Sequence, residues 1–93
     1  MDDIYAQIAE KIIEQQEAII GPIAVDQAQQ VSALAIDWQA HTVKVSGNPQ
    51  DAVDSLVEQY KVLFGKIAVE TCKEAVSKLL AQLPADQQPD SLK

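Results

Sequence analysis

The feature that most constrains this chain is a segment that occurs twice, each time around a glycine. Residues 8–30 align with residues 52–74 at an offset of 44, which pairs Gly21 with Gly65. The first copy reads IIGPIAVDQA around its glycine, and the second reads LFGKIAVETC. Apolar and small residues coincide throughout the alignment, so the sequence predicts two helix–glycine–helix units. Two explanations stay open: an internal duplication, and a chance likeness between amphipathic helices.

The first unit is predicted to form two helices with a break at the glycine. Apolar residues recur at helical spacing over residues 3–20, and Asp2 or Asp3 is well placed to cap this helix. Gly21 is expected to end it. Pro22 suits the first turn of a short second helix, where its missing N–H costs nothing.

A hairpin is predicted between the two units. Leu34, Ile36 and Trp38 lie at every second position, and so do Val43 and Val45. A period of two is typical of strands, here joined by a turn around residues 39–41. Because an isolated hairpin is unstable in water, its apolar face must lie on the helices, or its edge must pair with another chain.

The second unit carries a longer apolar stripe. Asn48 is a good N-cap and Pro49 a good first helical residue, and apolar residues then recur at helical spacing as far as Leu83. An unbroken helix of this length would span about 50 Å, which is long for so small a chain. Either the helix is bent or broken near Gly65, or its far end packs on a partner.

Together these patterns predict one α+β domain over residues 1–84. It is mostly helical, in the order helix, helix, β-hairpin, and a long helix that is bent or broken near Gly65. Residues 85–93 are mostly polar and include Pro89. We expect them to form a flexible polar tail.

The charge of the chain excludes two classes of partner. Its net charge is −7 and it contains no arginine, whereas nucleic acids and anionic membranes both require a cationic surface. No apolar run reaches the roughly 18 residues of a membrane-spanning helix. The single cysteine cannot form an internal disulfide, which fits a reduced cytoplasmic setting. We therefore expect a cytoplasmic protein that binds neither nucleic acid nor membranes.

Few side chains indicate chemistry. His41 is the only histidine and is expected in a turn, since a lone histidine lacks the partners of a zinc site or a catalytic triad. Glu10, Glu14 and Glu17 share a helix face, which solvation explains better than weak cation binding. Cys72 lies on the apolar stripe and is expected to be a buried thiol. No metal, cofactor or catalytic residue is predicted, and the chain is not expected to be an enzyme.

A short segment resembles a known family. Ile20–Ala24 reads IGPIA, which resembles a motif in small helical domains of unassigned function at the C-terminal end of some bacterial serine/threonine kinases. The VDQAQQ that follows departs from the basic continuation in those domains. The resemblance implies at most a helical regulatory or interaction module, and it supplies no catalytic residues.

A second resemblance supports an alternative function. The triplet Asp54-Ser55-Leu56 is similar to the Asp-Ser-Leu motif of acyl and peptidyl carrier proteins, which are also small, acidic and helical. It implies phosphopantetheine on Ser55. However, the predicted helix begins earlier, at Pro49, and the usual glycine before the motif is absent. The same triplet also recurs at residues 90–92.

The preferred prediction is a non-enzymatic protein–protein interaction or regulatory module that forms a homodimer. The long second stripe and the free hairpin edge both require burial that a small chain struggles to provide. Trp38 lies beside the turn, where it either contacts a partner or covers the core. The residues expected at the interface are Ile20, Gly21, Trp38, Phe64 and Gly65.

Overall fold

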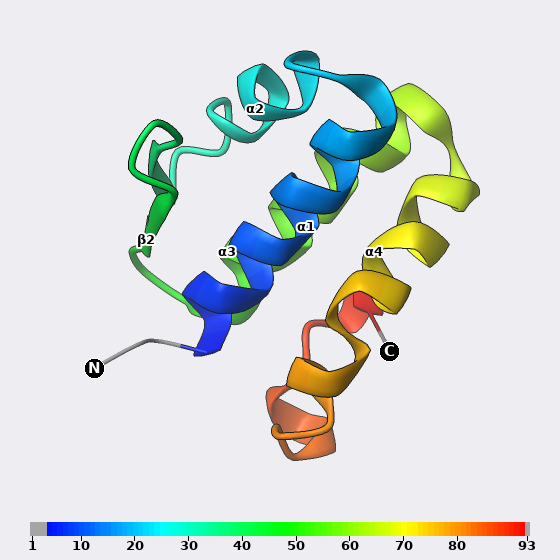
Figure 1. Cartoon of the computed structure of the whole chain (residues 1–93). Coiled ribbons are helices and arrows are strands. Elements are labelled where there is room, and N and C mark those ends of the chain that lie inside the picture. Colours follow the sequence, from blue (N-terminus) through cyan, green and yellow to red (C-terminus); the bar gives the residue numbers. More distant parts are fainter. Residues whose placement is uncertain (1–3, 93) are drawn as a thin grey trace.

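The computed structural model describes residues 4–92, in which four α-helices surround one core and a β-hairpin covers one side (Figure 1). The elements are α1 (Ile4–Ile20), α2 (Ile23–Ala28), β1 (Leu34–Asp37), β2 (Thr42–Val45), α3 (Pro49–Phe64), α4 (Lys66–Leu80) and the 3₁₀ turns η1 (Ala85–Gln87) and η2 (Asp90–Leu92). The predicted α+β class, mostly helical, is confirmed. The cap predicted at Asp2 or Asp3 lies outside the described residues.

The two longer first helices of the repeat, α1 and α3, form the centre of the arrangement. α1 and α3 lie side by side and run in the same direction, while α2 and α4 turn back on opposite sides of them (Figure 1). α1 packs against all three other helices, and α4 also packs on α3. Both glycine corners, one between α1 and α2 and the other between α3 and α4, therefore lie at the same end of the molecule.

The hairpin forms as predicted and rests on α1. β1 and β2 pair in antiparallel register, with Leu34 opposite Val45 and Ile36 opposite Val43. Leu34 and Val43 are buried, and β2 packs against α1. The apolar face of the hairpin is thus covered by a helix of the same chain, which is the first of the two alternatives that the sequence left open.

Local signals fix both ends of α3. The side chain of Asn48 accepts hydrogen bonds from the backbone N–H groups of Gln50 at 2.9 Å and Asp51 at 3.3 Å, as expected of an N-cap. At the other end the helix stops at Gly65, whose φ of 75° and ψ of −160° lie in a region that essentially only glycine occupies. The long stripe is therefore broken, and α4 packs back on α3.

The two glycine-centred copies have the same burial pattern. Seven positions are buried in each copy, and every member of the first set lies 44 residues before its counterpart: Ile8, Ala9, Ile12, Ile13, Gln16, Ala24 and Ala28, then Ala52, Val53, Leu56, Val57, Tyr60, Ala68 and Cys72. The backbone corresponds as well. The N–H of Gly21 donates to the carbonyl of Glu17 at 2.9 Å, and the N–H of Gly65 donates to that of Lys61 at 2.7 Å. The sequence repeat is therefore a structural repeat.

Two buried hydrogen bonds cross between the copies. Gln16 on α1 donates from Nε2 to Sγ of Cys72 on α4 at 3.4 Å. Its counterpart in the second copy, Tyr60 on α3, donates from its hydroxyl to the carbonyl of Ala24 on α2 at 2.7 Å. In each copy, the polar residue at the same position of the first helix thus bonds to the second helix of the other copy. This exchange is the pattern expected of two units related by a pseudo-twofold axis.

The C-terminal segment differs from the expected flexible polar tail. Its last described residue, Leu92, is buried together with Pro89. Asp54 on α3 accepts hydrogen bonds from the backbone N–H of Ser91 at 3.0 Å and from its hydroxyl at 2.6 Å. The Tyr5 hydroxyl donates to the carbonyl of Gln87 at 2.7 Å. Residues 85–92 therefore belong to the folded domain, because two apolar side chains and the Asp54 carboxylate anchor an otherwise polar segment.

Replacement of Gly65 tests the break between α3 and α4. A Cβ at this position would meet no atom within 4 Å, so the cost of Gly65→Ala comes from the backbone angle alone. We expect a loss of about 1–3 kcal/mol in the free energy of unfolding, measured by urea denaturation. The neighbouring exposed substitution Lys66→Ala should change it by less than about 0.5 kcal/mol. Chemically introduced D-alanine at residue 65 should restore the stability; a D-alanine variant as unstable as Gly65→Ala would contradict the explanation.

Replacement of Leu92 tests the docking of the C-terminal segment. Since Leu92 is only 3% exposed, Leu92→Ala should lower the free energy of unfolding by about 2–3 kcal/mol. Gln87→Ala is the matched control, because the exposed side chain at this position makes no hydrogen bond among residues 4–92 and only its backbone groups are bonded. Equal denaturation midpoints for Leu92→Ala and the wild type would show that the segment does not pack on the domain.

Candidate interaction surface

Large apolar side chains are exposed at the two glycine corners. We call these residues the corner surface: Ile19, Ile23, Val62, Leu63, Phe64 and Ile67. Val62 is 74% exposed and Ile67 is 72% exposed. Single exposed apolar residues are common on proteins, but a group gathered at one end of a molecule is typical of a contact site.

The structural repeat accounts for the composition of the corner surface. Ile19 and Ile23 of the first copy occupy the same positions as Leu63 and Ile67 of the second. All four are exposed, so both copies present apolar side chains at equivalent places. The chain therefore displays the same apolar element twice at one end. This regularity distinguishes the corner surface from a random scatter of apolar residues.

The structure brings together four of the five predicted interface residues. Phe64 is 42% exposed, and Gly65 beside it is also exposed. Ile20 and Gly21 lie at the other corner and are half-buried. All four thus lie at the corner end of the molecule, whereas Trp38 lies in the hairpin turn.

Trp38 is held against α1 by its own contacts. Its Nε1 donates to a carboxylate oxygen of Glu17 at 3.0 Å, and its ring stacks on that of His41 with centroids 4.5 Å apart. The ring is half-buried and packs against the core. Of the two roles left open by the sequence, these contacts favour covering the core over contacting a partner.

The three glutamates considered from the sequence lie on α1, and His41 lies in the hairpin turn. Glu14 is exposed, whereas Glu10 and Glu17 are half-buried. His41 lies in the turn between β1 and β2, as expected, with a positive φ of 53°. The sequence could not show that this turn folds over α1, so it gave no sign that His41 lies beside Glu10 and Glu14.

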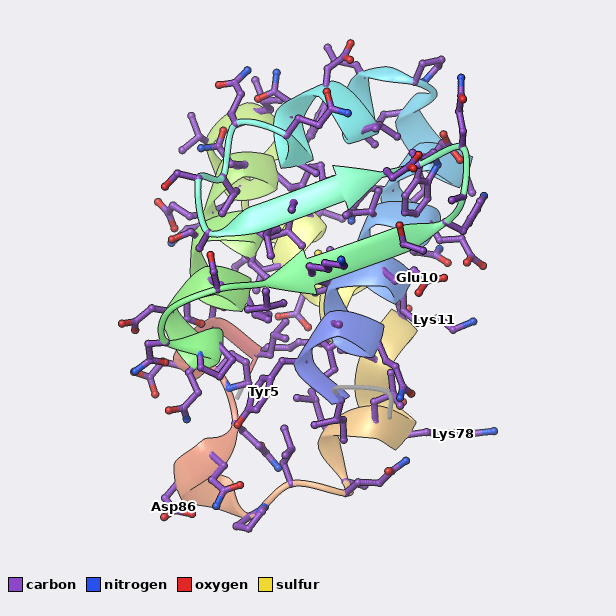
Figure 2. The ribbon with its side chains drawn as sticks, turned by 90° about the vertical axis from the view of Figure 1, so that its left-hand side faces the viewer. Tyr5, Glu10, Lys11, Lys78 and Asp86 are labelled. Atoms are coloured by element: carbon purple, nitrogen blue, oxygen red, sulfur yellow. The ribbon has the colours of Figure 1, made fainter. Side chains whose placement is uncertain are left out.

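A groove of about 310 Å³ lies between α1 and α4. It is lined by Gln7, Glu10, Lys11, Ala75, Lys78 and Leu79. Lys11 and Lys78 extend outward on the same side of the molecule in Figure 2. The polar side chains of this lining are two lysines, one glutamate and one glutamine, all exposed or half-buried.

Cys72 and Tyr60, the two titratable side chains buried within residues 4–92, are not suited to nucleophilic catalysis. Cys72 is fully buried, as predicted, and burial raises the pKa of its thiol to about 11, although the Gln16 hydrogen bond partly opposes the shift. Burial likewise raises the pKa of the Tyr60 hydroxyl, with a smaller contribution from the Cys72 thiol. Both groups therefore stay protonated at neutral pH, and the nucleophilic thiolate is scarce.

The structure assigns a different role to the first Asp-Ser-Leu triplet. Ser55 is exposed, but it lies in the second turn of α3 rather than at the start of that helix. Asp54 holds Ser91 of the second triplet, and Leu56 and Leu92 are both buried. The two triplets thus meet in the fold and attach the C-terminal segment to α3. The carrier function, with phosphopantetheine on Ser55, stays an alternative prediction.

Comparisons with known proteins add no further constraint. No family model matches the chain, and neither curated proteins nor solved structures gave a significant match. The resemblance of Ile20–Ala24 to helical domains of bacterial kinases therefore stays a prediction, now placed at the corner between α1 and α2. Among residues 4–92, no helix combines the length and apolar character needed to cross a membrane.

Proposed function

We propose that this chain is a non-enzymatic interaction module that pairs with a second copy of itself through the corner surface. The observation that carries the proposal is the gathering of exposed apolar side chains at both glycine corners. Burial of apolar area is the main favourable term in protein association. Because the helices already bury their stripes within the chain, the corner surface is the apolar area left for a partner.

The charges around the corner surface favour a second copy as the partner. Around the corner between α3 and α4, Lys61 and Lys66 are exposed beside one acid, Glu70, whereas the corner between α1 and α2 is flanked by the exposed Asp26 and the half-buried Glu17. In a twofold dimer, a contact between residue i of one subunit and residue j of the other is always made twice. Lys61 and Lys66 of each subunit can therefore face Glu17 and Asp26 of its partner.

The free thiol of Cys72 fits the reduced cytoplasmic setting that belongs to this proposal. The net charge of −7 supports a protein partner over a nucleic acid or an anionic membrane. The repeat supports a regulatory or scaffolding role in which the dimer, and not a catalytic site, is the active unit.

Sedimentation of a charge variant tests the proposal. The wild-type chain should sediment as a dimer, and the double substitution Val62→Asp/Ile67→Asp should make it a monomer with unchanged helical circular dichroism. Both side chains are exposed in the single chain, so a new aspartate at either position would lose its hydration only on formation of the dimer. A rise in salt concentration should weaken the dimer, since opposite charges meet across it.

The matched control is Ala35→Asp, an exposed position on β1 far in sequence from both corners. This variant should remain a dimer. A wild-type chain that is monomeric even at millimolar concentration would overturn the proposal. Dissociation of the Ala35→Asp variant would instead move the interface to the hairpin and would equally contradict it.

A further inference from the structure

The hairpin turn brings the only histidine onto the acidic face of α1. The ligand atoms of Glu10, Glu14 and His41 all lie within 4.8 Å of one another. The two glutamates are one helical turn apart on α1, and the imidazole comes from the turn between β1 and β2. Figure 2 shows Glu10 on α1 beside β2, with its side chain directed outward.

The position of His41 is fixed by the hairpin and not by the glutamates. The backbone N–H of His41 donates to the backbone carbonyl of Trp38 at 3.1 Å, which closes the turn. The imidazole stacks on the Trp38 ring, and Glu17 holds that ring through its Nε1. A third glutamate of the same helix face therefore anchors the turn, and the imidazole is placed before any ligand binds.

The carboxylate oxygens of Glu10 and Glu14 are available as ligands. Within residues 4–92, the carboxylates of Glu10 and Glu14 accept no hydrogen bond and form no ion pair; the one ion pair found there joins Lys73 and Glu70 on α4. Lys11 and Lys78 line the groove beside Glu10 without pairing with it. Within the described residues, no ion pair offsets the negative charge of these two carboxylates.

We propose that Glu10, Glu14 and His41 form a binding site for a divalent transition-metal ion. Two carboxylate oxygens and one imidazole nitrogen suit zinc, cobalt, nickel or copper, whereas magnesium and calcium prefer oxygen ligands alone. Small side-chain rotations bring three atoms within 4.8 Å onto one ion. Because the site joins α1 to the hairpin turn, a bound ion links two elements that are far apart in the sequence and stabilises the fold.

Trp38 provides a direct probe of the site. It is the only tryptophan, and its ring stacks on the proposed ligand His41. A paramagnetic nickel ion bound by His41 should therefore quench its fluorescence. Titration of the untagged full chain with nickel chloride should give saturable quenching at one ion per chain. Zinc chloride should displace the nickel and restore the emission.

Two substitutions in the site and one outside it complete the test. Glu14→Gln and His41→Asn should each weaken nickel binding by about tenfold or more, and asparagine tolerates the positive φ of residue 41. Glu58→Gln is the matched control, because Glu58 is the exposed counterpart of Glu14 in the second copy. It should bind nickel as the wild type does.

Thermal unfolding gives a second readout that does not depend on fluorescence. Zinc chloride should raise the melting temperature of the wild type and of Glu58→Gln, but not that of His41→Asn. Quenching without saturation, or identical nickel titrations for the wild type and His41→Asn, would overturn the proposal. Magnesium that binds as tightly as zinc would also overturn it, since the imidazole would then play no part.

Discussion

Two buried hydrogen bonds cross between the halves of the fold and join them inside a shared apolar core. A buried amide or hydroxyl without a partner costs about 1–3 kcal/mol, so each such group must find one. Gln16 on α1 bonds to Cys72 on α4, and Tyr60 on α3 bonds to the carbonyl of Ala24 on α2. Neither helix–glycine–helix unit contains both partners of these bonds. Each unit therefore completes the core of the other, and the glycine corners serve to turn the second helices back into reach.

Local patterns in the sequence predicted the parts of the fold that depend on neighbouring residues. The strand alternation, the Asn48 cap and the break at Gly65 are of this kind, since each follows from backbone geometry within a few residues. The C-terminal segment was not predicted, because its docking depends on Asp54, which is remote in sequence and shows no sign of this role. The cluster of His41 with two glutamates of α1 was missed for the same reason: it exists only once the hairpin folds over the helix.

The break at Gly65 also changes the basis for expecting a partner. The long stripe was one of two reasons to expect a dimer, and the structure buries it within the chain by packing α4 on α3 and α1. The corner surface now gives the reason to expect a dimer, and it arises from the same two glycines. A helix that ends at a tight corner leaves its last apolar residues, such as Leu63 and Phe64, without a neighbouring helix to cover them. The glycine corners that let the helices close the core thus also expose this apolar surface.

The interdependence of the two halves can be tested most directly by separating them. Two fragments, residues 1–46 and 47–93, divide the chain between β2 and α3, so that each keeps its own glycine corner. Far-ultraviolet circular dichroism should show little helix in either fragment alone, since each lacks the partners of its crossing hydrogen bonds. An equimolar mixture should recover the helix content of the intact chain. A fragment that folds alone to its full helix content would contradict the account, because its core would then not depend on the other half.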